Sequence, residues 1–266
     1  MARIEDYGMI GDLQTAALVG RDGSIDWACF PRFDSGACFA ALLGTPEHGR
    51  WLVAPRTDAW EGKRRYRPCT LVLETEWETD TGAIRVIDFM PPRGKAPDIV
   101  RIVEGLRGHV EMFSELVIRY DYGGTIPWVR RTADGRIAVA GPDALCFRTP
   151  VQHRGENLRT LGEFTVRKGD RVPFTLTWYP SNERPPRAID AEHALNETVE
   201  FWEDWANLCG YAGKWKEDVQ ASLVVLKGLT YAPTGGIVAA PTTSLPERSA
   251  ESGTGTTATA GSGMRR

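Results

Sequence analysis

Residues 71–90, LVLETEWETDTGAIRVIDFM, decide the fold. In the first half of this stretch, Leu71, Leu73, Thr75 and Trp77 alternate with Val72, Glu74, Glu76 and Glu78. This period of two gives one mostly apolar and one mostly acidic face, and it predicts a half-buried β-strand. Residues 79–82 then suit a turn and residues 84–90 a returning strand, so the stretch predicts an antiparallel hairpin.

The same β pattern extends on both sides of this hairpin, from residue 13 to about residue 179. Short apolar runs separated by turn signals lie at 99–103, 112–122, 137–139 and 145–148. Residues 164–166 and 172–178 flank Lys168-Gly169-Asp170, which predicts a second hairpin. Many short strands with little helical periodicity predict a mainly β fold, a large antiparallel sandwich.

The pattern becomes helical after Pro185-Pro186, a pair that breaks the sheet and is typical of a linker. Asp190 is placed to cap a helix, because its carboxylate can accept from the free amides of the first turn. Apolar residues then recur at three- and four-residue spacing. The first stripe is Leu195, Val199, Trp202, Trp205 and Cys209, and the second is Trp215, Val219, Leu223, Leu226 and Leu229.

Composition excludes several classes of function. A net charge of −3 provides no basic field for nucleic acid, and no apolar run approaches the roughly 20 residues that cross a membrane. The four histidines lie far apart and no CxxC pair exists, so we expect no metal site and no cofactor. Residues 1–9 lack the apolar region of a secretory signal and the five cysteines are scattered, which predicts a cytoplasmic protein with reduced thiols.

Acidic and aromatic residues lie together near the first helical stripe. Glu200, Glu203 and Asp204 beside Trp202 and Trp205 could form a sugar site. Helical spacing, however, places the two tryptophans on one apolar face of the helix and the three acidic residues on another face. Core packing with a solvated acidic face is therefore the favoured interpretation.

The opening segment, residues 4–44, carries the most specific motifs of the chain. It contains DYG-x-IGD, TAALV, DGSIDW and PRFDS in that order, and later segments contain RIVEGLRG, VIRYDYG, FTLTWYPS and LKGLTYAPTGGIVAAPTTSLPE. Through these motifs residues 4–247 resemble the bacterial family 15 glycoside hydrolases, the glucoamylase and trehalase-like group, with their trehalase-like N-terminal domain. The resemblance implies a β super-sandwich, a linker helix and then an (α/α)6 barrel.

This resemblance also implies how the chain is divided. Residues 1–183 would form the β-sandwich domain, 184–213 the linker helix, and 214–247 the start of an incomplete barrel. The first barrel helix would run from Trp215 to Tyr231. Residues 248–266 would be a disordered tail, since their Gly-, Ser-, Thr- and Ala-rich composition offers little to bury.

A frameshift would explain the tail. In the family the sequence after Glu247 resembles GGxRNWDYRYCWLRDA, whereas this chain reads RSAESGTGTTATAGSGMRR. Each amino acid of residues 255–265 largely fixes the first two bases of its codon. In the neighbouring reading frame, these bases become the last two bases of each codon. All of these pairs of bases are compatible with codons that spell WDYRYCWLRDA. We therefore expect a one-base frameshift after Glu247.

Four residues are candidates for contact with substrate. By the resemblance, Thr242 and Thr243 begin a loop that borders the sugar pocket, and Arg32 and Asp34 line its mouth from the sandwich. An arginine–carboxylate pair is suited to orient sugar hydroxyls. The alternative is that Asp34 merely forms a turn with Ser35 and Gly36. The family's catalytic glutamates lie beyond Glu247, so no catalytic residue is assigned to this chain.

Two functions remain open. In the first, the intact enzyme hydrolyses an α-glucoside with inversion, which needs two carboxylic acids roughly 6.5–9.5 Å apart, and this chain alone is inactive. In the second, the sandwich is a free-standing carbohydrate-binding or interaction module. The two differ at residues 215–231: a self-contained module should cover that apolar stripe, whereas a chain without its barrel should expose it and self-associate through it.

Overall fold

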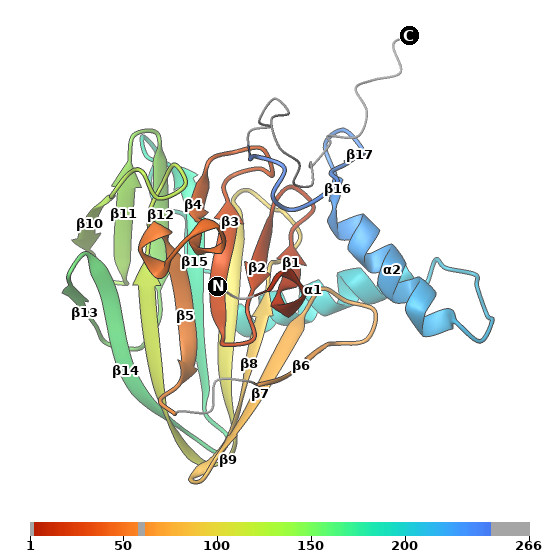
Figure 1. The fold of residues 1–266 in the computed structure, drawn as a ribbon, viewed down its shortest axis with the longest axis horizontal. Coiled ribbons are helices and arrows are strands. Elements are labelled where there is room, and N and C mark those ends of the chain that lie inside the picture. Colours follow the sequence, from red (N-terminus) through yellow and green to blue (C-terminus); the bar gives the residue numbers. More distant parts are fainter. Residues whose placement is uncertain (1–2, 58–61, 246–266) are drawn as a thin grey trace.

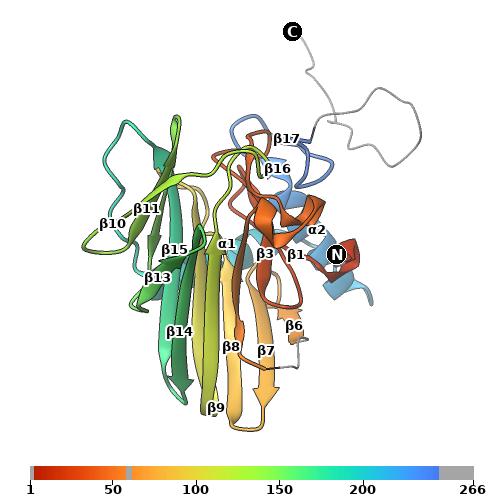
Figure 2. The ribbon, with the colours of Figure 1, turned by 60° about the vertical axis from the view of Figure 1, so that its left-hand side comes forward.

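One long strand, β9 (Asp98–Val117), organises the fold. The computed structural model describes residues 3–57 and 62–245, and within them β9 belongs to both layers of a sandwich (Figures 1 and 2). Its first half pairs with strands of one layer, and its second half with strands of the other. The sequence predicted separate strands at 99–103 and 112–122. The structure joins them, because Gly105 and Gly108 allow the strand to bend without ending.

All strands of the sandwich are antiparallel, as the sequence predicted. One layer contains β1 (Gly8–Gly11), β2 (Ala16–Val19), β3 (Ser24–Cys29), β4 (Ala37–Phe39), β5 (Arg50–Pro55), the second half of β9, β13 (His153–Glu156) and β14 (Arg159–Arg167). The other contains β6 (Lys63–Tyr66), β7 (Leu73–Thr79), β8 (Gly82–Phe89), the first half of β9, β10 (Trp128–Arg131), β11 (Arg136–Ala140), β12 (Asp143–Arg148) and β15 (Arg171–Pro180). Large apolar side chains such as Trp51, Phe147 and Phe174 fill the space between the layers.

In the part of the chain that the structure describes, three 3-10 helices and two α-helices accompany the strands of the sandwich. The 3-10 helices are η1 (Ile4–Asp6), η2 (Ala41–Leu43) and η3 (Pro46–His48). The α-helices are α1 (Ala191–Ala206) and α2 (Lys216–Gly228), followed by a small hairpin of β16 (Thr230–Tyr231) and β17 (Gly236–Ile237). Within the described residues, no helix is long and apolar enough to cross a membrane.

Helix α1 covers the outside of the sheet beside β7, β8 and β9. Asp190 caps it by accepting hydrogen bonds from the amides of Glu192 (3.0 Å) and His193 (3.1 Å), as predicted. Leu195 packs into a cluster that includes Val72 and Ile87. The apolar contact with the helix thus involves Val72, just before β7, and Ile87 of β8.

The hairpin of β7 and β8 is confirmed, but its acidic face is not simply solvated. The Glu74 side chain is only 4% exposed. It accepts hydrogen bonds from Arg67 Nε (2.7 Å) and Arg65 Nη2 (3.0 Å), and Arg85 lies 3.7 Å away. Burial alone would raise the pKa of Glu74, but these arginines lower it overall. Arg65 of β6, Arg85 of β8 and Arg67, just after β6, thus surround Glu74 on the mostly acidic face that the sequence predicted.

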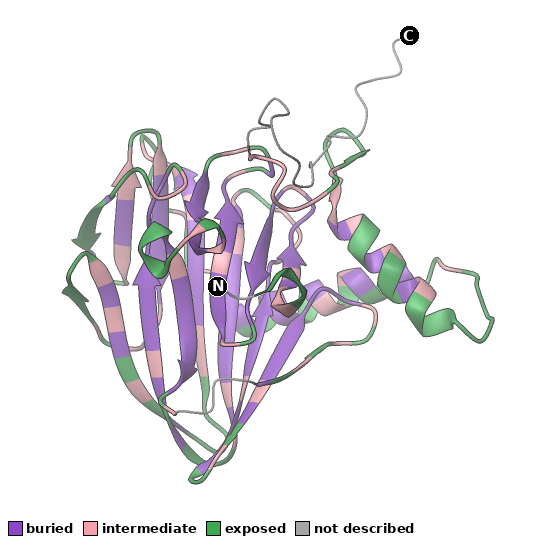
Figure 3. Ribbon diagram, viewed as in Figure 1, coloured by how far each residue is buried: buried purple, intermediate pink, exposed green. Residues whose placement is uncertain are grey.

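Helix α2 is shorter than the stripe predicted, and it packs differently. Its buried residues are Gln220, Val224 and Gly228, so the face against the sandwich is offset from the expected stripe. Gly228 lies where a Cβ atom would come within 2.4 Å of the Leu71 side chain. The small size of Gly228 allows close packing, while Val225 and Leu226 are exposed. Figure 3 shows exposed segments along α2.

Candidate functional site

The segment 240–245 returns from α2 to the end of the sandwich that carries β3. Trp27 Nε1 donates to the Pro241 carbonyl (3.0 Å), and the Tyr122 hydroxyl donates to the Ser244 carbonyl (2.8 Å). The Sγ atom of Cys29 lies 3.3 Å from Ser244 Oγ. Trp27 and Cys29 belong to β3 and are buried, so this segment, which contains Thr242 and Thr243, is held against the sandwich core.

Arg32 and Asp34 form an ion pair in the loop after β3. Arg32 Nε donates to Asp34 Oδ1 (2.8 Å) and Arg32 Nη2 donates to Oδ2 (2.5 Å). The two side chains are 52% and 59% exposed. The hydrogen bonds from Arg32 lower the pKa of Asp34. Asp34 is therefore ionised at neutral pH and is not suited to donate a proton as a general acid.

Arg32 also contacts the hairpin that follows α2. Its guanidinium carbon lies 5.9 Å from the centre of the Tyr231 ring, within the range of a cation–π contact. Tyr231 is part of β16, and the amide of the next residue, Ala232, donates to the Leu13 carbonyl (2.8 Å). The exposed pair thus lies between the opening segment of the chain and the end of α2.

A buried network of hydrogen bonds holds the backbone next to Arg32 in place. The carboxylate of Asp12, fully buried, accepts from the amides of Gln14 (2.9 Å) and Thr15 (2.8 Å). Its other oxygen accepts from Arg93 Nε (2.6 Å), and Arg93 Nη2 donates to the Pro31 carbonyl (2.6 Å). Asp12 belongs to the DYG-x-IGD motif, so the sequence pointed to it. Nothing in the sequence predicted that Arg93 would be its partner, because the two residues lie 81 positions apart.

The structure brings the four predicted residues to one end of the sandwich, but among the described residues no hydrogen bond joins Arg32 or Asp34 to Thr242 or Thr243. Arg32 and Asp34 contact each other, whereas the Thr243 amide donates to Ala240 (3.2 Å) and the Thr242 carbonyl accepts from Leu245 (3.0 Å). Thr243 Oγ1 is buried and has no hydrogen-bond partner within the described residues. Hydroxyls and a charged pair at such an end can bind polar ligands, but they supply no acid–base pair.

The sequence raises the question of two further kinds of site: the acidic and tryptophan residues of α1, and a metal site. Trp202 is 1% exposed, while Glu200, Glu203 and Asp204 point to solvent, so core packing with a solvated face is confirmed. Among residues 3–57 and 62–245, no group of three or more His, Cys, Asp or Glu side chains is arranged to hold a metal ion.

Known proteins share both the sequence and the fold. The family model described as trehalase-like, N-terminal, matches residues 1–154. Trehalase of Mycobacterium tuberculosis is 32% identical over 274 residues, which cover 92% of this chain and 40% of that protein. Trehalase of Thermoplasma volcanium is 31% identical over 262 residues, again 92% of this chain and 40% of the relative. The chain thus spans about 40% of the length of these relatives.

A solved structure has the same arrangement of strands. A bacterial glucoamylase complexed with acarbose matches with a TM-score of 0.64 over 90% of this chain and 43% of that chain. The sequence identity is 11%, so this likeness concerns the fold alone. It agrees with the antiparallel sandwich predicted from the sequence.

Proposed function

Because the chain belongs to the trehalase-like N-terminal family, we propose that it forms the non-catalytic N-terminal part of a family 15 glycoside hydrolase that cleaves an α-glucosidic bond with inversion. The attachment of residues 240–245 to Trp27 and Cys29 of β3, the strand that precedes the Arg32–Asp34 loop, carries this proposal. It brings the polypeptide, after its helices, back to the end of the sandwich where polar side chains are exposed. The trehalases that match nine-tenths of this chain support the same class of reaction.

In this proposal Arg32, Asp34, Thr242 and Thr243 border the sugar pocket. The pair is half-exposed and held rigidly by its two hydrogen bonds, which favours orientation of hydroxyl groups over proton transfer. The acid and base of an inverting enzyme would come from the barrel beyond Glu247. The proposed division is therefore a sandwich at 1–183, a linker helix at 184–213 and the start of the barrel at 214–247.

The exposure of α2 supports this proposal over a free-standing module. Trp215, Val225 and Leu226 are 56%, 41% and 49% exposed. A self-contained binding module would leave little reason for a helix to present large apolar side chains to solvent. Further barrel helices of a longer enzyme would cover them.

The first test is an assay of the chain itself. Purified residues 1–266 should release no glucose from trehalose, maltose or isomaltose, while the M. tuberculosis trehalase serves as a positive control for trehalose. Glucose release that remains after removal of contaminating enzyme would refute the proposal. Residues 246–266, which carry the predicted frameshift, lie outside the described residues. Sequencing the gene across the codons of Glu247 to Ala250 tests it.

The second test concerns the candidate site in a version of the chain that continues in the corrected frame. Arg32→Ala should lower kcat/KM by about 10- to 100-fold, because a charged hydrogen bond to substrate is lost. Arg21→Ala is the control, since Arg21 also forms an exposed ion pair, with Asp6 at 3.0 Å. An unchanged kcat/KM in the Arg32 variant, with an unchanged Tm, would remove Arg32 from the site.

A further inference from the structure

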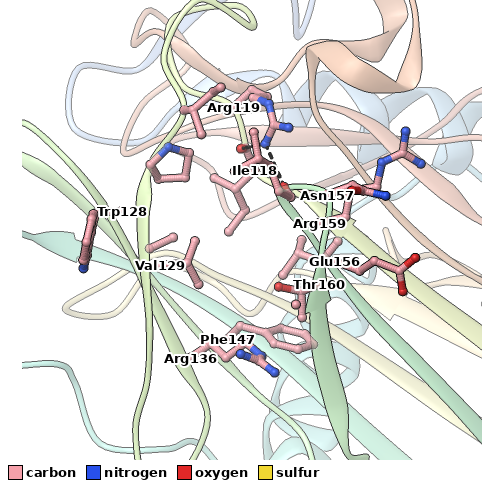
Figure 4. A pocket seen from close by; sticks show the side chains of 16 residues that line it. Ile118, Arg119, Trp128, Val129, Arg136, Phe147, Glu156, Asn157, Arg159 and Thr160 are labelled. Atoms are coloured by element: carbon pink, nitrogen blue, oxygen red, sulfur yellow. Dashed lines mark hydrogen bonds between the residues drawn. The ribbon is translucent and has the colours of Figure 1, made fainter.

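A cavity of about 400 Å³ opens at the edge of the sandwich opposite α2. Its lining comes from both layers. Figure 4 shows Trp128 and Val129 on one wall, and Asn157, Glu156 and Thr160 on the opposite wall. Arg119 lies at one end, whereas Arg136 and Phe147 lie at the other.

Strand β10, which forms one wall, is an edge strand. It pairs with β11 on one side, and no strand of the described residues pairs with its other side. All four of its residues are exposed, including Trp128 at 77% and Val129 at 46%. An open strand edge presents free backbone N–H and C=O groups to which another extended chain can pair.

Several of the described arginines lie at this edge of the sandwich. Within the described part of the chain, no carboxylate forms an ion pair with Arg119, Arg130, Arg131 or Arg136. Arg119 is only 4% exposed. Its Nη1 donates to the carbonyls of Ile118 (2.8 Å) and Leu158 (3.2 Å). Burial lowers the pKa of the Arg119 guanidinium by more than the attraction of Glu47 raises it.

The acidic side chains nearby are already paired. Glu156, the acid in the cavity wall, lies 3.2 Å from Arg154. Arg159 bonds both Glu47 and Glu115. The edge is therefore a basic region on a chain whose net charge is −3, and it would attract a negatively charged partner.

Protection against aggregation does not account for the whole arrangement. Arginines on an edge strand do discourage pairing between copies. The exposed indole of Trp128 and the exposed Leu158, at 66%, have the opposite effect. An apolar wall followed by the basic side chains of Arg130, Arg131 and Arg136 instead matches a ligand that carries an apolar residue with acidic residues to one side of it.

We propose that this edge binds an extended acidic peptide segment of a partner protein. The peptide backbone pairs with the open side of β10, an apolar side chain enters the cavity against Trp128 and Val129, and acidic side chains to one side of it approach Arg130, Arg131 and Arg136. The site is independent of the sugar pocket, so its failure would leave the hydrolase proposal untouched.

The test is selection from a phage-displayed library of random nonapeptides on the 266-residue chain. Enriched peptides should carry an apolar or aromatic residue with acidic residues to one side of it. The best one, labelled and measured by fluorescence polarisation, should bind more weakly as the salt concentration rises. Absence of enrichment, or enrichment of neutral or basic sequences, would overturn the proposal.

Variants locate the peptide on the edge. Arg130→Glu combined with Arg131→Glu, and separately Trp128→Ala, should each weaken binding by about tenfold or more. The matched controls are Arg107→Glu, at an exposed residue in the middle of β9, and Trp215→Ala at the N-cap of α2. Equal losses in the control variants would refute the assignment to β10. Thermal unfolding checks that every variant is folded.

A proline scan of the selected peptide distinguishes backbone pairing from charge attraction. Proline removes an N–H donor and cannot join a strand ladder at its inner positions. Replacement at alternate positions should weaken binding by about tenfold, whereas replacement at the positions between them should have little effect. Binding that tolerates proline everywhere would contradict strand addition.

Discussion

At the scale of single residues, buried charged groups separate what supports the fold from what could bind a ligand. Arg101 is fully buried and bonds Asp88 at 2.7 Å, as well as the carbonyls of Trp51 and Gly23. All of these contacts lie inside the sandwich, so the pair holds strands together. The Arg32–Asp34 pair instead lies at the surface, where its unused lone pairs and N–H groups can meet a substrate.

Asp98 should make stability depend on pH. Burial raises its pKa from 3.8 to about 6, although the Thr177 hydroxyl donates to it at 2.5 Å. Between these values the folded chain retains a proton that the unfolded chain releases, so the free energy of unfolding falls as the pH rises. Asp98→Asn should therefore be more stable than the parent above pH 6, by about 1–3 kcal/mol. Below pH 4 the gain should vanish.

Urea unfolding at pH 3.5 and pH 7.5 measures this difference. The control is Glu78→Gln, which alters an exposed carboxylate of β7 and should change stability little at either pH. A parent chain as stable as the Asp98 variant at pH 7.5 would show that the carboxyl is not destabilising when ionised.

At the scale of elements, the sequence predicted strands and helices well because their periodicity is local. The hairpin at 71–90 and the Asp190 cap follow from side chains within a few positions of each other. Contacts between distant segments were not predictable in this way. The burial of Glu74 depends on arginines of β6 and β8, and the support of the Arg32 loop depends on Arg93.

The cap of α1 should contribute to the stability of the whole sandwich. Asp190→Ala leaves two amides of the first turn without their acceptor, so the free energy of unfolding should fall by about 0.5–2 kcal/mol. Asp204→Ala is a matched control, because it removes an exposed acid from the last turn of the same helix. There the macrodipole disfavours negative charge, so stability should stay constant or rise slightly. Equal losses in both variants would argue against the cap.

At the scale of the whole molecule, the two ends of the sandwich differ. One end carries α2, the candidate sugar site and apolar residues on the outer face of the helix. The opposite edge carries β10 and the arginine-lined cavity. Local patterns in the sequence do not show this separation, because each end is assembled from strands that lie far apart in the chain.

Self-association through α2 follows from this arrangement. Trp215, Val225 and Leu226 expose apolar area, and covering each large side chain contributes about 1.5–3 kcal/mol. The chain should therefore form dimers or larger species in size-exclusion chromatography with light scattering, and Val225→Ser with Leu226→Ser should shift it toward monomer. Leu43→Ser, at a residue 44% exposed outside α2, should not. A monomeric parent chain at high concentration would refute this.

The shared strand β9 has a consequence for how the molecule comes apart. Because its 20 residues are hydrogen-bonded in both layers, neither layer can melt while the other keeps all of its partners. The sandwich should accordingly lose its structure in a single cooperative step, and its slowest-exchanging amide protons should lie along this one strand, on both sides of the bend.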